Sequence, residues 1–201
     1  MAKSADMKIE PESDKVSVNG KDILYKKYLY IMLNKPSGYV CSTDDGVSPT
    51  VIDLLPDNLK RRGLFPAGRL DKDTEGFVLI TDDGAFAHDI LSPEKHVAKK
   101  YFCRLEKKAE KSYENAFKSG ITLSSGEECK PAFIEFCDDE NSVYLTIFEG
   151  KFHQIKRMFE TLGNRIIYLK RVQIGGLFLD ENLALGECRE ILHKELLKIK
   201  A

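Results

Sequence analysis

Short segments rich in β-branched and aromatic residues follow one another closely along this chain. They lie at residues 28–33, 76–81, 96–106, 130–139, 142–150 and 164–179. The first of them, YLYIML, is expected to be a half-buried strand, and an acidic turn between 130–139 and 142–150 predicts a hairpin. Parallel neighbours would need crossovers of a dozen or more residues. Many connections here are shorter, so the sequence predicts an α+β domain on a mostly antiparallel mixed sheet with flanking helices.

Helix signals separate these strands. They occur in residues 48–62, with Ser48 as N-cap and Pro49 in the first helical position, in 85–93, stopped by Pro93, in 111–120, ended by Gly120, in 151–163 and in 188–199. Apolar side chains in the fourth segment recur at helical spacing and are expected to face the core: Phe152, Ile155, Phe159 and Leu162.

The composition limits the classes of protein to which the chain can belong. The 201 residues carry a formal net charge of -1, which argues against coating nucleic acid through bulk charge but leaves room for a local basic cleft. The five cysteines include no CxxC pair, so a disulfide framework or a cysteine-rich zinc site is disfavoured. No stretch approaches the ~20 apolar residues that span a bilayer, and no signal peptide is recognisable. We expect a cytoplasmic protein with no membrane segment.

The stretch FPAGRLDKDTEG concentrates carboxylates in a few residues. Asp71, Asp73 and Glu75 occupy positions 1, 3 and 5 of a calcium-loop pattern, and Asp82 falls at position 12. That last position is normally glutamate, and helices should flank a calcium loop. Here FPAG cannot be helical and FVLIT indicates a strand, so the calcium interpretation is disfavoured.

Two interpretations of the same stretch remain open from spacing alone. Its carboxylates could belong to a surface turn that faces water, as loop carboxylates usually do. Alternatively, Leu70 and the apolar residues 77–80 bracket the turn with buried side chains. Asp71 would then lie at the wall of a cleft.

The stretch AGRLDKDTEGFVLITDDG resembles the signature of the RNA pseudouridine synthases, in the branch that modifies ribosomal RNA. Further blocks resemble that branch in the same order: YIMLNKPSGYVCSTDD, SPEKHVAKKYFCRLE, EGKFHQIKRMFETLGN and RVQIGGLFLDENLALGECREI. The resemblance extends over residues 28–193. It implies the pseudouridine synthase fold with a central RNA-binding cleft.

The resemblance also implies a reaction and the residues that perform it. Members of the family isomerise uridine in RNA to pseudouridine, with the aspartate of GRLD, here Asp71, as catalytic residue. A carboxylate can act as a nucleophile or remove a ribose proton, and the sequence leaves both routes open. The isomerisation is redox-neutral, so neither a metal nor an organic cofactor is expected. Tyr101 matches the tyrosine that stacks on the flipped base, and Lys156 matches the basic residue that pairs with the aspartate.

Substrate-binding roles follow from the same match. Arg69 is expected to fill the space that the flipped uridine leaves in the RNA. Arg157 is expected to contact phosphate, and Leu177 to line the uracil pocket. Asp73 and Glu75 are expected to be solvated or capping residues, and His153 is given no catalytic role.

The resemblance suggests a division of the chain and a target. Relatives carry an N-terminal S4-like RNA-binding domain, and only residues 9–23 resemble its last part. We therefore expect residues 1–26 to be a remnant of that domain with a linker, and residues 27–201 to be the catalytic domain. YVCSTDD and RVQIGG resemble the small-subunit (16S) enzymes more than their 23S relatives. The expected partner is ribosomal RNA or an assembling ribosomal subunit, with no obligate protein partner. Alternatives are a 23S enzyme and a non-catalytic RNA-binding assembly factor.

Overall fold

A computed structural model of the chain describes residues 7, 16–23, 26–92, 94–95 and 97–200. In this described part, nine strands form one sheet whose main order is β11-β3-β5-β9-β6-β8-β7, with β4 beside β5 and β10 beside β9. The strands are β3 (Tyr30–Lys35), β4 (Phe65–Pro66), β5 (Glu75–Thr81), β6 (Lys99–Leu105), β7 (Phe133–Phe136), β8 (Ser142–Ile147), β9 (Ile166–Ile174), β10 (Leu177–Phe178) and β11 (Cys188–Glu190). Every described pair except β5 with β9 is antiparallel, which confirms the predicted mostly antiparallel sheet.

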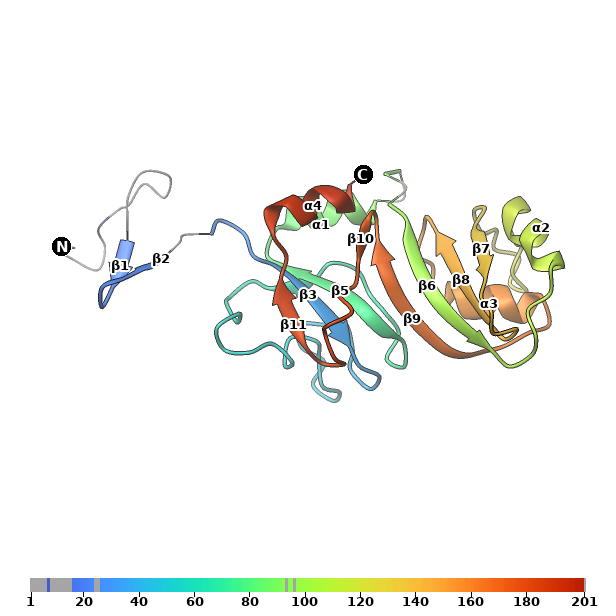
Figure 1. The fold of residues 1–201 in the computed structure, drawn as a ribbon, viewed down its shortest axis with the longest axis horizontal. Helices are drawn as coiled ribbons and strands as arrows, with labels where there is room; N and C mark the ends of the chain where they lie inside the picture. The colour runs from blue at the N-terminus through green and yellow to red at the C-terminus, as the bar shows by residue number, and fades with distance from the viewer. Residues whose placement is uncertain (1–6, 8–15, 24–25, 93, 96, 201) are drawn as a thin grey trace.

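The described helices lie at the two ends of this sheet (Figure 1). They are α1 (Gly84–Leu91), α2 (Ser112–Ser119), α3 (Gln154–Thr161) and α4 (His193–Ile199). The first three confirm the helices that the sequence predicts in residues 85–93, 111–120 and 151–163. Gly120 ends α2 with φ 84°, as the sequence predicts.

The helix predicted in residues 48–62 is wrong. This segment forms successive turns, and Thr50 pairs with Val40 in an isolated bridge. The carboxylate of Asp53 accepts hydrogen bonds from the backbone and hydroxyl groups of Thr50, at 2.7 and 3.0 Å. The bridge holds the start of the segment extended, and Pro56 in its middle has no backbone N–H to continue a helix.

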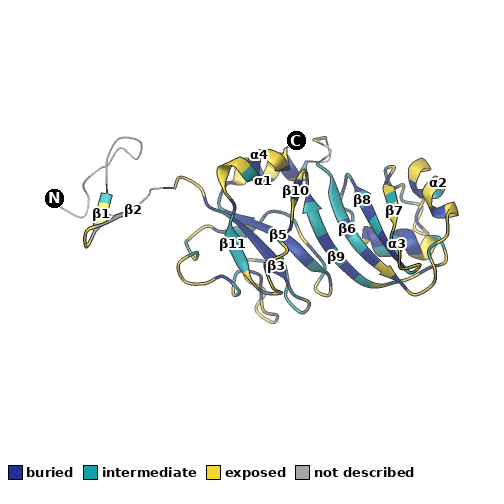
Figure 2. Cartoon of the chain, in the orientation of Figure 1, coloured by how far each residue is buried: buried dark blue, intermediate teal, exposed yellow. Residues whose placement is uncertain are grey.

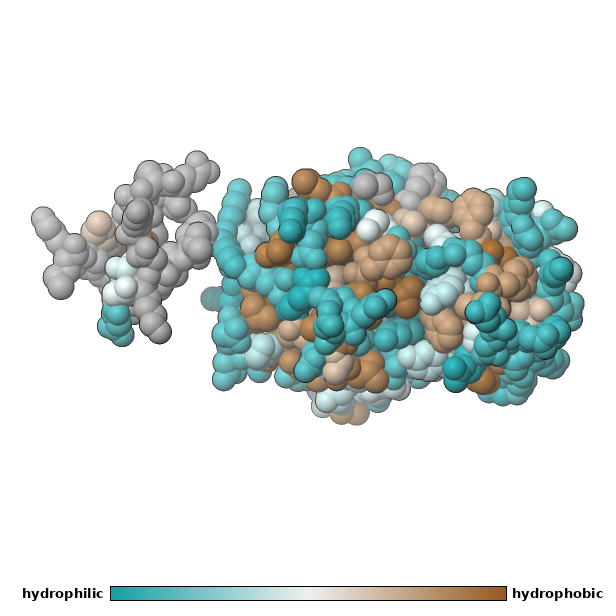
Figure 3. Space-filling view, in the orientation of Figure 1, coloured by the Kyte–Doolittle hydropathy of each residue, from teal (hydrophilic) through white to brown (hydrophobic). Residues whose placement is uncertain are grey.

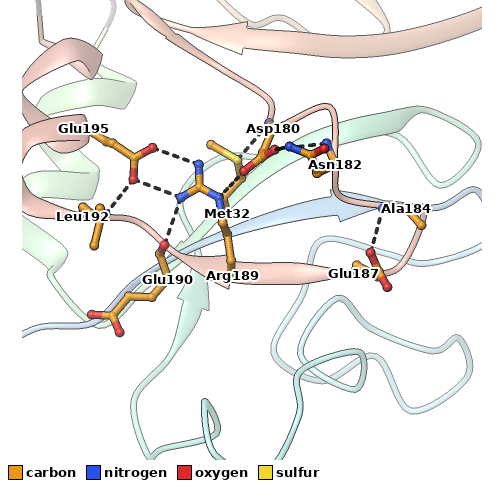
Figure 4. A network of polar contacts seen from close by, with 9 residues as sticks. All are labelled: Met32, Asp180, Asn182, Ala184, Glu187, Arg189, Glu190, Leu192 and Glu195. Carbon is orange, nitrogen blue, oxygen red and sulfur yellow. Dashed lines mark hydrogen bonds and ion pairs between the residues drawn. The ribbon is translucent and has the colours of Figure 1, made fainter.

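The prediction of one helix across residues 188–199 is only partly right. Its first three residues form β11, which pairs with β3, and the helix begins later, at His193. Arg189 binds Asp180 on one side and Glu195 on the other, at 2.6 and 2.9 Å, as Figure 4 shows. Glu195 also accepts the backbone N–H of Leu192 at 2.8 Å, which satisfies a free donor at the start of α4.

Two hydrophobic clusters lie on opposite faces of strand β3. Ile31 and Leu33 face one cluster, with α2 and α3, and Met32 faces the other, with α1 and α4. The strand is therefore buried on both faces and not half-buried as expected, and it is among the most buried elements in Figure 2.

The strands β6, β8 and β9 are covered on one face only. Their uncovered face carries the partly exposed rings of Phe102, Tyr144 and Tyr168. The ring of Phe102 contacts the rings of both tyrosines edge to face. Figure 3 shows hydrophobic side chains reaching the surface over this half of the sheet. The covered face, under α2 and α3, is the one that carries Tyr101.

The two halves of the sheet meet at a short parallel contact between β5 and β9. Only Glu75 and Gly76 pair with Lys170 and Arg171. A Cβ on Gly76 would lie 2.2 Å from the carbonyl oxygen of Arg171, and the φ of Gly76 is +100°. Only glycine fits this approach, which fixes the start of β5 and therefore the loop that precedes it.

The N-terminal strands β1 (Val16–Val18) and β2 (Lys21–Ile23) form a separate two-stranded sheet. Asn19 and Gly20 connect them with φ values of 54° and 75°, as a two-residue hairpin turn of type I′ requires. The domain boundary after residue 26 stays a prediction. No helix in the described residues has the length and apolar character to cross a membrane.

Candidate active site

The loop between β4 and β5 is held by a buried lysine. Lys35, at the end of β3, has no exposed surface. Its ammonium group donates to the carbonyl oxygens of Asp71, Lys72 and Thr74 at 3.1, 3.1 and 2.7 Å, and to that of Pro36 at 3.1 Å. Burial lowers the pKa of Lys35. Its partners are backbone carbonyls, which fix the course of the loop on both sides of Asp71.

Two further contacts tie this loop to the segment after β3. The thiol sulfur of Cys41 accepts the backbone N–H of Leu70 at 3.3 Å. The backbone N–H of Gly38 donates to the carbonyl of Lys72 at 2.8 Å. Together with Lys35, these bonds leave the Asp71 side chain free to face the cleft.

The carboxylate of Asp71 lies between two basic side chains of the α3 region. Lys156 Nζ is 3.0 Å from one oxygen, and His153 Nε2 is 3.6 Å from the other. The Asp71 side chain is 27% exposed, so water reaches it but surrounds it only in part. The carboxylate is therefore paired with a cation from α3.

Lys156 also binds Asp73, at 2.7 and 3.0 Å. Burial lowers the pKa of Lys156, but hydrogen bonds to Asp73 and Asp71 outweigh it, so this pKa lies above its ordinary value. Burial likewise raises the pKa of Asp73, but the hydrogen bond and the charge of Lys156, with smaller contributions, together bring it below its ordinary value. Lys156 therefore stays charged at neutral pH between two carboxylates.

The turn before α3 is fixed by side chains of its own helix. Arg157 donates to the carbonyl of Phe152 at 3.2 Å, and also to Glu127 at 3.0 Å and Ser125 at 2.7 Å. His153 has φ 49°, in the left-handed region that non-glycine residues rarely adopt. This backbone conformation turns the chain into α3 and places the imidazole beside Asp71.

These groups line an open cleft of about 490 Å³. Its lining consists of Ser37, Gly38, Asp71, Lys72, Asp73, His153 and Lys156. The cleft joins three parts of the sequence that are far apart: the segment after β3, the β4–β5 loop and the start of α3.

The predicted base-stacking tyrosine is not among the residues that line this cleft. Tyr101 in β6 is 7% exposed and belongs to the same hydrophobic cluster as Leu70, the neighbour of Asp71. Its cross-strand partners are Leu145 and Arg171.

The other predicted site residues are placed differently from one another. Arg69 is exposed, and within the described residues its guanidinium has no hydrogen bond or ion pair. The guanidinium of Arg157 donates hydrogen bonds to Glu127, Ser125 and a backbone carbonyl. Leu177 is 5% exposed in the cluster under α4 and does not line this cleft.

The carboxylates of the calcium-loop pattern diverge in the structure. Asp71 and Asp73 bind Lys156, whereas Glu75 accepts the hydroxyl of Tyr168 at 2.7 Å. Asp82 accepts the backbone N–H of Leu29 at 2.8 Å. Strands flank the loop, and no group of three or more metal-ligating side chains is found among the described residues. The calcium interpretation therefore fails on geometry.

The comparison with known families decides the identity of the chain. The family model described as RNA pseudouridylate synthase matches residues 29–161. The chain belongs to this family. That range contains the Asp71 loop, Tyr101 and Lys156.

Several known proteins resemble this RNA pseudouridine synthase over most of its length. A ribosomal small subunit pseudouridine synthase A of Escherichia coli is 41% identical over 201 residues, which covers 99% of this chain and 86% of the relative. An uncharacterized RNA pseudouridine synthase of Bacillus subtilis is 42% identical over 198 residues, with 97% and 83% covered. A crystal structure of a pseudouridylate synthase matches with a TM-score of 0.81 at 42% identity, with 98% of this chain and 84% of that one covered.

Three residues that form or support the cleft of this pseudouridine synthase were not predicted from the sequence. Asp73, expected to be solvated, binds Lys156, and His153 lies against Asp71. For Lys35 the sequence offered only a weak indication, a lysine that follows an apolar segment and precedes a proline. Such a lysine can be exposed to solvent or buried with several acceptors, and only the fold distinguishes the two.

Proposed function

We propose that this pseudouridine synthase isomerises a specific uridine of small-subunit (16S) ribosomal RNA, with Asp71 as the catalytic carboxylate. The contact between Asp71 and Lys156 in an open cleft is the observation that supports the site. The small-subunit target is supported by relatives that are named for that substrate, at 41% identity in Escherichia coli and 47% in Haemophilus influenzae.

The reaction needs only the groups that the cleft offers. The bond from C1′ of the ribose to N1 of uracil breaks, a bond from C1′ to carbon C5 forms, the C5 proton leaves and N1 gains a proton. Asp71 attacks C1′ as a nucleophile or removes a ribose proton, and an ionised carboxylate serves either route. Lys156 orients this carboxylate through their ion pair.

The target uridine must leave its stack before the carboxylate can reach C1′. In the proposal Tyr101 stacks on the displaced uracil, and the unpaired guanidinium of Arg69 occupies the vacated space in the RNA. Arg157 has protein acceptors for both terminal nitrogens, so we assign it the support of the α3 turn and not the phosphate contact expected from the sequence. Leu177 is left out of the uracil pocket, because it packs under α4.

The proposal includes the division of the chain. Residues 27–201 act as the catalytic domain, and residues 1–26 act as a remnant of an RNA-binding domain with its linker. Leu29 is the first residue along the described chain that is found buried in the core, and its backbone N–H donates to the carboxylate of Asp82. This supports a catalytic domain that begins close to residue 27. The cytoplasm, where ribosomal RNA is modified during assembly, is the proposed location.

Pseudouridine mapping tests the target directly. Unmodified 16S RNA, naked and as a partly assembled subunit, is incubated with the protein and mapped by carbodiimide labelling and primer extension. One new stop in 16S RNA is expected. A stop in 23S RNA with none in 16S RNA would contradict the small-subunit assignment, and no stop in either RNA would contradict ribosomal RNA as the substrate.

A further inference from the structure

Phe152, the residue before His153, is exposed, contrary to its expected place in the core. Its side chain is 75% exposed. The helical spacing that assigned it to the core does not apply, because α3 begins only at Gln154. Ile155 and Phe159, which lie inside the helix, are buried as expected. The exposed phenyl ring therefore has no part in the packing of α3.

The ring of Phe152 lies flat on the imidazole of His153. The two ring centroids are 3.8 Å apart and the planes are inclined by 18°. The same imidazole reaches to 3.6 Å from Asp71. One face of the phenyl ring is thus covered by an imidazole whose Nε2 lies near Asp71.

The backbone holds this stack in place. Arg157 fixes the carbonyl of Phe152 at 3.2 Å, and its own N–H donates to the carbonyl of His153 at 3.0 Å. The amide oxygen of Gln154 accepts the N–H of Lys151 at 3.0 Å. His153 keeps a left-handed conformation in this turn. An exposed apolar ring on a fixed backbone can stack against another flat ring.

We propose that Phe152 is a stacking platform for an unpaired nucleobase of the substrate RNA, next to the target uridine. Displacing the target uridine unstacks the neighbouring base, which then needs a new partner. Aromatic side chains supply such partners, because every base has a π-face. The inference builds on the proposed function only in taking RNA with a displaced uridine as the ligand. Phe152 would be a binding residue and would not touch the reacting atoms.

The absence of tryptophan from the chain allows a direct test. Phe152→Trp, made in an Asp71→Asn background to prevent turnover, introduces a single indole whose fluorescence a stacked base would quench. Phe178→Trp is the matched control, because Phe178 is 60% exposed and lines a different pocket, on the uncovered face of the sheet. Unmodified 16S RNA is the ligand, and fluorescence anisotropy of labelled RNA measures binding in the same samples.

We expect RNA to quench the emission of the Phe152→Trp protein and to leave that of the Phe178→Trp protein unchanged. RNA binding without quenching in the first protein would overturn the platform. Failure of the unsubstituted Asp71→Asn protein to bind RNA would instead count against the proposed function.

A second series separates stacking from simple apolar contact. Phe152→Leu and Phe152→Ala should both weaken RNA binding by about tenfold or more, whereas Phe152→Tyr should bind like the wild type. Because the side chain is exposed, none of these substitutions removes a core contact, and thermal melts check that each variant is folded. Wild-type affinity in Phe152→Leu would overturn the proposal.

Discussion

The ammonium group of Lys156 lies 3.0 Å from a carboxylate oxygen of Asp71. The contact joins α3 to the β4–β5 loop. A different side chain fixes the backbone around each of the two residues. Lys35 fixes the backbone of the Asp71 loop through three carbonyls, and Arg157 fixes the turn that precedes Lys156 in α3. The arrangement fits an enzyme that must present one ionised carboxylate in a fixed position.

Removing the charge of Lys156 should impair catalysis more than folding. We expect Lys156→Met to lower kcat by about a hundredfold, the effect typical of losing one positioned charged group. Asp73→Asn is the control within the same cluster. The Asp73 side chain is 69% exposed, and contacts of such groups are screened by water. Single-turnover rates of pseudouridine formation measure both variants, and equal rates in the two would contradict the assigned role of Lys156.

The buried ammonium of Lys35 should be important for stability. Lys35→Met removes a donor from four carbonyl oxygens, of which those of Asp71 and Lys72 keep a backbone donor, so the free energy of unfolding should fall by about 3 kcal/mol or more. Lys60→Met provides a comparison, since Lys60 forms only an exposed pair with Asp57 at 3.8 Å. Urea denaturation gives both values. A loss below about 1 kcal/mol for Lys35→Met would show that the loop does not depend on this lysine.

Lys99 should make stability depend on pH in the alkaline range. Burial, with the nearby guanidinium of Arg171, lowers its pKa from 10.5 to about 8. Between these values the unfolded chain binds more protons than the folded chain, so the contribution of Lys99 to the free energy of unfolding rises with pH.

Lys99→Met should remove this rise, and Lys100→Met should keep it. Lys100 is the adjacent residue and binds Glu135 at 2.7 Å. Urea denaturation at about pH 7.5 and about pH 10 measures the difference between variants. Identical pH dependence in the wild type and Lys99→Met would show that the Lys99 pKa is not lowered.

The contact between the two halves of the sheet should not tolerate a side chain at Gly76. The Cβ of Gly76→Ala would lie 2.2 Å from the backbone oxygen of Arg171, in a backbone with φ +100°. We expect a loss of several kcal/mol, about 3 or more, or an insoluble protein. Gly84→Ala has no atom within 4 Å of its new Cβ and should melt within a few degrees of the wild type. Similar melting of both variants would contradict the tight β5–β9 approach.

Local patterns predicted most of the fold, and long-range contacts explain the failures. The hairpin of β7 and β8 and the helix ended by Gly120 depend on neighbouring residues, so the sequence was sufficient. Residues 188–190 form a strand because β3 offers them a free edge. Phe152 is exposed because the helix starts two residues later than its apolar spacing suggests.

The candidate site was predicted in part. Resemblance pointed to Asp71 and Lys156, and the fold brings them into contact. Their catalytic roles stay predictions. Lys35 and His153 could not have been placed from the sequence, because the acceptors of Lys35 are backbone carbonyls distant along the chain and the imidazole reaches Asp71 through an unusual backbone angle.

The central claim is that Asp71 performs the isomerisation, and Asp71→Asn tests it most directly. Asparagine keeps the shape of the side chain but is neither a nucleophile nor a base. Pseudouridine formation in single-turnover assays should disappear, while RNA binding measured by anisotropy should stay close to that of the wild type. Pseudouridine formation at the wild-type rate by the Asp71→Asn protein would contradict the account.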